Sequence, residues 1–313
     1  MMSRWERSWA WRSRPSSSLR QWHGSAAQPR PARHRGDGDD SRDPTAHLTY
    51  DDVMVDDNER GFRRALIEAS AYFGLDHERL EPLGGMTGRV FGIDDAVLRL
   101  GSPETIAHEL AAANAASVAV PVPATLGTFV PTDGGPWAAS LIERVDGTVA
   151  ADLSGVTAER AFTRGLACGR AQAALWTVTA PPAFASIDGE RSLLHLDLHP
   201  LNILLGPDDR VTAVIDWTNA AAGSPDYDQA RTSAIFRLDP HAIPLLDQPV
   251  WRAFLAGWTE GASLDDASTA ARIWACRFML HDLQHRHPGD ALDHVRHELE
   301  VLEEATESAQ SVP

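Results

Sequence analysis

Hydrophobic positions change their spacing along the chain, and these changes divide it into three parts. Residues 1–50 are rich in Arg, Ser, Pro and Gly and have no sustained apolar period, so we expect a disordered tail. From about residue 58, the segment NERGFRRALIEASAYFG places apolar residues at helical spacing, and Gly74 is the expected stop. Residues 51–145 and 146–313 then differ in pattern, and we expect each of them to form a lobe.

Short segments with strand-like patterns dominate residues 51–145. Ser102 and Pro103 interrupt them and predict the start of a helix, because a Ser side chain caps free N–H groups and Pro fits the first turn. We therefore expect a small lobe in which a helix packs across an antiparallel sheet. Its strands are expected in LEPL (80–83), RVFGI (89–93), AVLRL (96–100), VAVPVPATLGTFV and WAASLIERV.

Residues 146–313 have a mainly helical pattern with one strand–loop–strand segment inside it. TAERAFTRGLACGRAQAALWTV (157–178) predicts a long helix. LLHLDLHPLNILL (193–205) and VTAVIDW (211–217) predict two strands, which the turn GPDD closes into a hairpin. Four helices are expected between residues 226 and 308, with breaks near Pro240, Gly261 and Pro288-Gly289.

Composition narrows the class of protein. The chain has 313 residues, of which 43% are hydrophobic and 23% charged, as in soluble globular proteins. No stretch approaches the roughly 18 consecutive apolar residues of a membrane helix. Cys168 and Cys276 form no CxxC pair, which argues against a disulfide framework or a structural zinc site and favours the reducing cytoplasm.

Charge restricts the partners. The chain contains no lysine, so its 28 basic residues are all arginines, and its net charge is −16. Residues 1–36 carry eight Arg and one Glu, a net of +7, which leaves −23 on the rest. An acidic body repels nucleic acid phosphates and suits a cationic small molecule. We therefore expect neither a nucleic acid partner nor a membrane partner.

The predicted hairpin carries the side chains with most chemistry. Magnesium takes hard oxygen ligands, usually one or two carboxylates together with phosphate oxygens. The amide oxygen of Asn202 and the carboxylate of Asp216, on the two arms of the hairpin, could share one cation that also holds the phosphates of a nucleotide. Asp197 lies on the same loop and could accept a proton from an attacking hydroxyl or orient it. That division of labour is typical of phosphoryl transfer.

HLDLHPLN followed by IDW resembles the aminoglycoside phosphotransferase and choline kinase-like family, whose usual motif is H-G-D-x-x-x-x-N followed by I-D-W or I-D-F. The resemblance covers most of residues 60–300 and includes PVP (121–123), LIERVDG (141–147) and GSPDYDQAR (223–231). It implies an α+β, protein-kinase-like two-lobed fold, with a small antiparallel β-sheet lobe and a larger mainly helical lobe. It also implies Mg²⁺ as cofactor and ATP or GTP as co-substrate.

The same resemblance implies roles for individual residues. Asp197 would be the catalytic base, with Asn202 and Asp216 as the magnesium ligands. His195 would brace the catalytic loop, and His199 is expected to be structural or near the substrate. Asp228 would support the loops, or else be only a first-turn helix acid favoured by the helix dipole. Glu143 and Val145 of the hinge would offer backbone groups to a purine.

Three departures from the family pattern concern the nucleotide side and the loop. Without lysine, the phosphate-holding pair becomes Arg99 and Glu109, and Arg can hold a phosphate bidentately. Leu196 stands where the family usually has Gly, which is harmless if its backbone stays at negative φ. The phosphate-covering loop would be GGMTG, with Gly84, Gly85 and Gly88, although a plain hairpin turn is an alternative.

We therefore predict a cytoplasmic kinase that transfers phosphate to a small hydroxyl compound, such as an aminoglycoside-, macrolide- or choline-like acceptor. Segment 272–290, rich in Trp, Phe, Met and His, is either a pocket wall or an ordinary core helix, and Asp226, Asp282 and Asp290 could meet an amine. The alternatives are a catalytically impaired kinase-like ligand-binding protein and a metal-dependent hydrolase. Protein kinase activity is disfavoured by the short distance from Asp216 to Pro225, which leaves little room for an activation segment.

Overall fold

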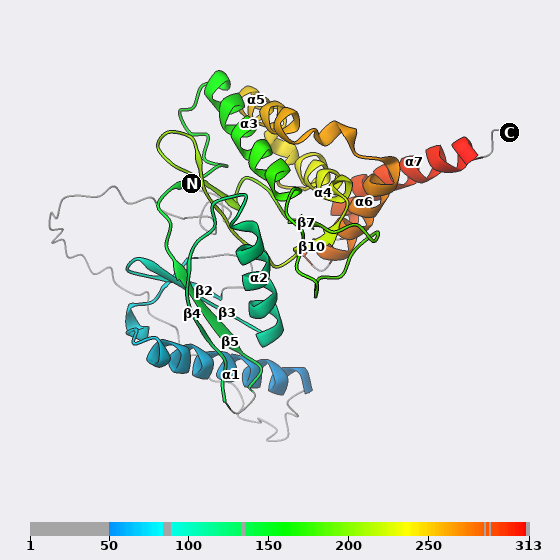
Figure 1. Cartoon of the computed structure of the whole chain (residues 1–313). Coiled ribbons are helices and arrows are strands. Elements are labelled where there is room, and N and C mark those ends of the chain that lie inside the picture. Colours follow the sequence, from blue (N-terminus) through cyan, green and yellow to red (C-terminus); the bar gives the residue numbers. More distant parts are fainter. Residues whose placement is uncertain (1–49, 84–88, 133–134, 285, 288, 311–313) are drawn as a thin grey trace, which may run out of the picture.

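A computed structural model describes residues 50–83, 89–132, 135–284, 286–287 and 289–310. These residues form two lobes, and the small lobe contains the sheet labelled β2 to β5 in Figure 1. The expected α+β, two-lobed architecture is confirmed. The expected tail and the GGMTG turn, with Gly84, Gly85 and Gly88, lie outside the described residues.

The small lobe is a five-stranded antiparallel sheet in the order β1-β2-β3-β5-β4. The predicted strands RVFGI and AVLRL correspond to β2 and β3, whereas LEPL supplies only the two residues of β1. The strands are β1 (Glu81–Pro82), β2 (Val90–Ile93), β3 (Ala96–Gly101), β4 (Thr125–Phe129) and β5 (Ala138–Glu143).

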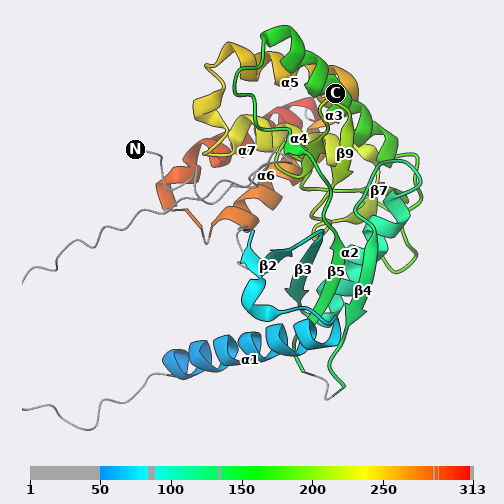
Figure 2. The same cartoon turned by 90° about the vertical axis from the view of Figure 1, so that its left-hand side faces the viewer.

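Two helices and a short 3₁₀ turn complete the small lobe. Helix α1 (Tyr50–Tyr72) lies across the lower end of the sheet in Figure 2, and its Ala65 and Ala69 pack into a core with Leu98 and Trp137. It begins at Tyr50, well before the predicted start near residue 58. Helix α2 (Pro103–Ala116) begins as predicted, since the Ser102 hydroxyl accepts a hydrogen bond from the Thr105 N–H at 3.1 Å. The turn is η1 (His77–Arg79).

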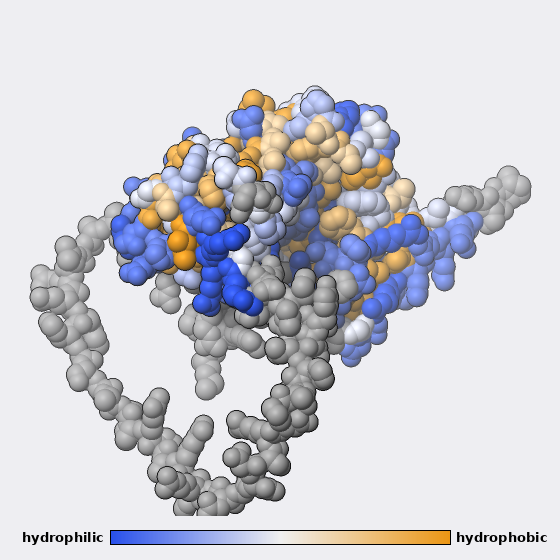
Figure 3. All heavy atoms as spheres, turned by 90° about the horizontal axis from the view of Figure 1, so that it is seen from below, coloured by the Kyte–Doolittle hydropathy of each residue, from blue (hydrophilic) through white to orange (hydrophobic). Residues whose placement is uncertain are grey.

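The large lobe is mainly helical. The predicted long helix is α3, and the four helices expected between residues 226 and 308 are α4 to α7. The C-terminal end of α7 extends away from the body, and its surface is hydrophilic (Figure 3). The helices are α3 (Ala158–Leu175), α4 (Pro225–Leu238), α5 (Pro249–Ala262), α6 (Thr269–Leu283) and α7 (Asp293–Gln310), with 3₁₀ turns η2 (Ile243–Leu245), η3 (Leu264–Asp266) and η4 (Gly289–Leu292).

Helices α3 and α5 approach each other closely because glycines face each other across the contact. A Cβ atom on Gly165 would lie 1.9 Å from the Phe254 carbonyl oxygen, and one on Gly257 would lie 2.0 Å from the Phe162 carbonyl oxygen. No side chain fits at such distances, so the two backbones pack directly. The two helices therefore form one closely packed pair in the large lobe.

Two small sheets lie between the helices and carry the predicted hairpin. Strand β7 (Ser192–Leu194) pairs with β10 (Ala221–Gly223), and β6 (Thr148–Val149), β8 (Ile203–Leu205) and β9 (Val211–Val214) form the second sheet. The loop 195–202 therefore connects β7 to β8. Among the described residues, no helix is long and apolar enough to cross a membrane.

Candidate functional site

The hairpin β8–β9 brings two predicted ligands side by side. Ile203 pairs with Val214, and the Ile215 N–H donates a hydrogen bond to the Asn202 carbonyl oxygen at 3.0 Å. Asn202 and Asp216 thus leave the same end of the hairpin, on neighbouring strands. The Asp216 side chain is 40% exposed, so its carboxylate is accessible from outside.

Asp197 belongs to the same loop and is held near Asn202. The Asn202 side-chain amide donates to the Asp197 carbonyl oxygen at 2.9 Å and lies 3.2 Å from Nε2 of His199. A carboxylate oxygen of Asp197 lies 3.9 Å from the same His199 nitrogen. His199 therefore contacts both predicted functional side chains from within the loop.

Asp228 contacts the loop from the first turn of α4. It is fully buried, and its Oδ1 accepts hydrogen bonds from the backbone N–H groups of His195 at 3.1 Å and Leu196 at 2.7 Å. Its Oδ2 accepts from Gln172 Nε2 and Trp176 Nε1, both at 3.0 Å. The helix-dipole interpretation alone does not account for these contacts, because the carboxylate joins α3, α4 and the loop.

Leu196 differs from the sequence expectation. Its φ is 59°, in the left-handed region that glycine adopts freely, and not the negative φ under which a leucine would be harmless. Asp228 holds its N–H, and Nε of Arg231 donates to its carbonyl oxygen at 3.2 Å. This conformation costs a leucine about 1–2 kcal/mol. It persists because side chains of α4 hold both the N–H and the carbonyl oxygen of Leu196. Asp216 also has positive φ, 66°.

His195 connects the loop to the strand that leads to Asp216. Its Nε2 donates to the Ile215 carbonyl oxygen at 3.1 Å, and its ring lies 4.6 Å from that of Trp217. Burial lowers the pKa of His195, against the opposite effect of Asp228 and Asp197, so the ring is neutral at pH 7. Its buried Nδ1 has no hydrogen-bond partner in the described part of the chain.

The structure brings Arg99 and Glu109 together as predicted from the missing lysine. Nη2 of Arg99 lies 2.5 Å from the Glu109 carboxylate and 3.3 Å from Oδ1 of Asp216, so the guanidinium spans both lobes. Burial raises the pKa of Glu109, although Arg99 and Thr218 act against it. Burial also opposes ionisation of Asp216, but Arg99 and Thr218 outweigh it, and the pKa of Asp216 falls below its ordinary value.

Thr218 and Arg231 are two residues of this site that the sequence analysis missed. The Thr218 hydroxyl donates to Glu109 at 2.7 Å or to Asp216 at 2.8 Å and lies 2.8 Å from Nη2 of Arg99. Nη2 of Arg231 lies 3.7 Å from the Asp197 carboxylate and 3.6 Å from that of Asp282. Arg231 ends the segment GSPDYDQAR and so lies within a stretch that carried the resemblance, whereas Thr218 lies directly after IDW.

Other predicted residues lie farther from the loop or are engaged elsewhere. The Glu143 N–H donates to the Ala124 carbonyl oxygen at 2.8 Å, and Val145 lies half-buried between β5 and β6. Asp226 accepts hydrogen bonds from the N–H and hydroxyl of Ser268, at 2.7 and 2.5 Å, and Asp282 lies between Arg231 and Arg286. Asp290 is exposed in the turn before α7.

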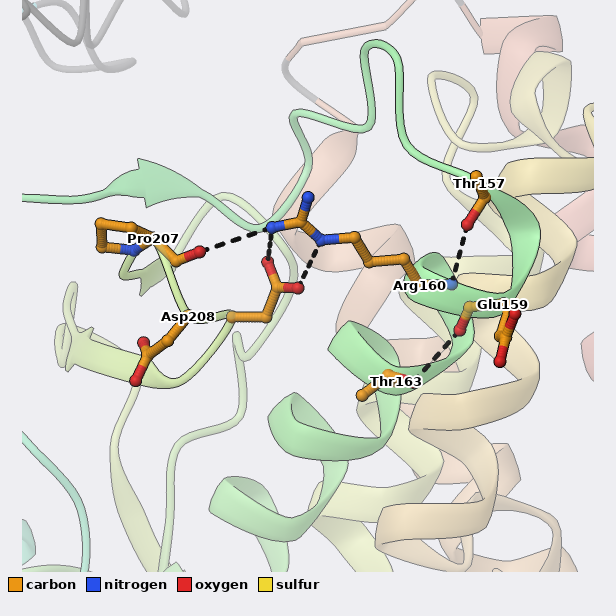
Figure 4. Close-up of a pocket in the computed structure, with 7 residues that line it drawn as sticks. Thr157, Glu159, Arg160, Thr163, Pro207 and Asp208 are labelled. Atoms are coloured by element: carbon orange, nitrogen blue, oxygen red, sulfur yellow. Dashed lines mark hydrogen bonds and ion pairs between the residues drawn. The ribbon is translucent and has the colours of Figure 1, made fainter.

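A hollow of about 360 Å³ lies elsewhere, at the N-terminus of α3 (Figure 4). Arg160 points across it toward the turn of the β8–β9 hairpin, where it donates to the Asp209 carboxylate at 2.5 and 3.0 Å. Nε of Arg164 donates to the same carboxylate at 2.7 Å. Arg160 and Asp209 of this hollow are thus paired with each other, and we assign no ligand to it.

Comparisons with known proteins agree with the motifs. Residues 170–264 match the sequence profile of a family described as phosphotransferase enzyme family. No curated protein matches the chain.

Solved structures of aminoglycoside phosphotransferases also resemble the chain. A 3′-phosphotransferase of type VIII is 17% identical with a TM-score of 0.48, and the match covers 68% of this chain and 95% of that one. A GDP complex of a 2′-phosphotransferase-IIIa variant is 17% identical with a TM-score of 0.44 over 74% and 93% of the two chains. A variant of APH(4)-Ia, in a ternary complex with AMP-PNP and hygromycin B, is 19% identical with a TM-score of 0.36 over 59% and 85%.

Proposed function

We propose that this chain is a phosphotransferase of the family whose profile residues 170–264 match, and that it transfers the terminal phosphate of ATP or GTP to a hydroxyl group of a small molecule. The observation that carries the proposal is the shared position of three side chains. Asn202 and Asp216 leave the same end of one hairpin, and the Asn202 amide holds the loop that bears Asp197. We propose that the Asn202 amide and the carboxylates of Asp197 and Asp216 act together on one bound nucleotide and its acceptor.

Asn202 and Asp216 are the proposed magnesium ligands. Both offer hard oxygen atoms, which Mg²⁺ prefers, and one or two protein ligands suffice when phosphate oxygens complete the shell. The lowered pKa of Asp216 keeps its carboxylate ionised and able to bind a cation, and Mg²⁺ would share this carboxylate with the Arg99 guanidinium, which lies 3.3 Å away. The donor set therefore fits the ion. Bound Mg²⁺ would supply charge neutralisation of the phosphates.

Asp197 is the proposed catalytic base. As the acceptor oxygen forms its bond to the terminal phosphorus, the bond from that phosphorus to the bridging oxygen breaks, and a nucleoside diphosphate leaves. The proton of the hydroxyl passes to the Asp197 carboxylate. Arg99, fixed by Glu109 at 2.5 Å, is the proposed contact to the nucleotide phosphates in place of lysine. His195 and Asp228 are proposed to hold the loop. The His195 ring bonds to the Ile215 carbonyl oxygen of the hairpin, and Asp228 accepts hydrogen bonds from the His195 and Leu196 N–H groups.

The proposed acceptor is aminoglycoside-, macrolide- or choline-like, bound between the Asp197 loop and α6. Asp226 and Asp282, which were expected to meet an amine, are already bonded to Ser268 and to Arg231 and Arg286. A cationic acceptor would have to compete with these partners. We propose the cytoplasm, where nucleoside triphosphates are available, as the location of the reaction.

Nucleotide consumption with a panel of acceptors tests the proposal. We expect ATP or GTP turnover with at least one acceptor, and the isosteric variant Asp197→Asn should lower kcat by roughly 10²–10⁴-fold because it cannot take the proton. Asp208→Asn, an exposed acidic position in the hairpin turn, is the matched control and should retain turnover.

Three results would contradict the assignment. Near-normal kcat in Asp197→Asn removes that residue from the proposed role. Phosphate release that does not depend on any acceptor favours the hydrolase alternative. Nucleotide binding without turnover favours a kinase-like binding protein.

A further inference from the structure

We propose that Arg231 is the positioning residue that fixes the Asp197 carboxylate and joins it to helix α6. The inference rests on the proposed function, because it concerns the residue assigned there as the base. Arg231 lies in the middle of α4, one turn after Asp228, and the sequence analysis gave it no role.

Arg231 contacts two consecutive residues of the catalytic loop. Its Nε donates to the Leu196 carbonyl oxygen at 3.2 Å, and its Nη2 lies 3.7 Å from Oδ1 of Asp197. The planar guanidinium thus faces the backbone before Asp197 and the side chain of Asp197 at once. The hydrogen bond to Leu196 fixes the guanidinium against the loop backbone, and the ion pair at 3.7 Å then favours one orientation of the Asp197 carboxylate.

The nitrogen of Arg231 that faces Asp197 also faces α6. Nη2 lies 3.6 Å from Oδ2 of Asp282, and the guanidinium carbon lies 4.9 Å from the centre of the Phe278 ring. Both residues belong to the segment 272–290 that was considered as a wall of the acceptor pocket. Arg231 therefore occupies the position between the proposed base and the proposed acceptor wall.

A contribution to the stability of the fold does not by itself explain why the charged guanidinium of Arg231 is buried here. Arg231 is 2% exposed, and its Nη1 has no hydrogen-bond partner within the described residues. Burial lowers the pKa of Arg231, and the neighbouring Asp197 and Asp282 oppose that effect. Replacing a buried ion pair by apolar side chains is often neutral or stabilising. A buried guanidinium that keeps an unsatisfied donor is better explained by the orientation it gives to Asp197.

Steady-state kinetics of Arg231→Met and Arg231→Lys test the inference. The Met side chain is close to Arg in length and keeps its apolar stem. We expect the Arg231→Met variant to lower kcat about 10²-fold, as for a catalytic group displaced by about 1 Å. The KM for the nucleotide should change less than about threefold. Lys keeps the charge without the planar fork and should recover about tenfold of that loss. Arg237→Met on the same helix removes an exposed arginine that pairs with Asp265 at 2.6 Å, and it should leave kcat unchanged.

A double-variant cycle separates positioning from simple support of the fold. If Arg231 acts through Asp197, Arg231→Met should cause no further loss of kcat in the Asp197→Asn background. An undiminished loss in that background, or wild-type kcat in Arg231→Met, overturns the inference and leaves the proposed function intact. No turnover in the wild-type protein with any nucleotide or acceptor overturns the proposed function, and the inference with it.

Discussion

At the scale of single residues, the strained backbone of Leu196 shows how α4 controls the loop. Its carbonyl oxygen and N–H are each bonded to a buried charged side chain of α4, and its side chain is 3% exposed. Local backbone strain of this kind occurs where surrounding contacts fix a conformation that the residue itself disfavours. Leu196 directly precedes Asp197, so the backbone geometry at the proposed base is maintained at a cost in the free energy of folding.

The difference in unfolding free energy between a Gly and an Ala variant at position 196 measures that strain. At φ 59°, Leu196→Gly should be more stable than Leu196→Ala by about 1 kcal/mol, because only glycine is relaxed there. Leu194 is the control, since it is equally buried but lies in strand β7. There, Leu194→Gly should be less stable than Leu194→Ala by about 0.5–1 kcal/mol. Urea unfolding of the four variants gives both differences, and the same order at both positions would refute the strain.

At the scale of elements, one carboxylate attaches the β8–β9 hairpin to α3. Asp209 sits in the hairpin turn with φ 63°, and both Arg160 and Arg164 of α3 donate to it. The hydrogen bond from Arg160 contributes most to lowering the pKa of Asp209, and its effect is larger than the opposite effect of burial. Because this hairpin carries Asn202 and Asp216, its attachment also affects the candidate site.

The lowered pKa gives this attachment a defined pH dependence. A carboxylate with a lower pKa in the folded protein stabilises it above the ordinary pKa of about 3.9, and the effect is lost as the pH falls through the folded value. Asp209→Asn should therefore lower the urea midpoint at pH 7, and the difference from wild type should shrink below about pH 4. Asp208→Asn, whose exposed carboxylate pairs with Arg210, is the control and should match wild type. A difference that stays constant with pH would contradict the ionic explanation.

At the scale of the whole molecule, the two lobes are connected by polar contacts beside the site. His108 of α2 donates to the Ala220 carbonyl oxygen at 2.9 Å, and Arg99 of β3 reaches Asp216 and Thr218. The proposed nucleotide contact and the proposed metal ligand therefore belong to different lobes but to one charge cluster. Nucleotide binding should depend on this connection.

Removing the Arg99 side chain tests whether nucleotide binding depends on this connection between the lobes. Arg99→Ala should raise the Kd for ATP or GTP about tenfold or more, the effect of losing a charge-assisted hydrogen bond of about 1.5–3 kcal/mol. Arg79→Ala removes another arginine of the same lobe, which pairs with the exposed Asp94 at 2.5 Å, and it should leave the Kd unchanged. Calorimetric titration in the presence of Mg²⁺ measures both variants. Equal Kd values for Arg99→Ala and wild type would remove Arg99 from the nucleotide site.

The sequence by itself determined the order of the elements and the composition of the site. The helix start at Ser102, the strands β2 and β3, and the hairpin with Asn202 and Asp216 follow from local patterns, because caps, turns and apolar periods act over a few residues. The residue types in HLDLHPLN and IDW likewise fixed the chemistry that the loop can offer.

Only the tertiary structure decided how that loop is held. An apolar period shows that a helix face is buried but not which distant backbone it meets, so the contacts from Arg231 to Leu196 and from Thr218 to Glu109 left no local signal. The positive φ of Leu196 could not be predicted either, because leucine disfavours it and long-range hydrogen bonds impose it. Residue types and spacings are written in the chain, whereas the placement of charges in low-dielectric surroundings exists only after packing.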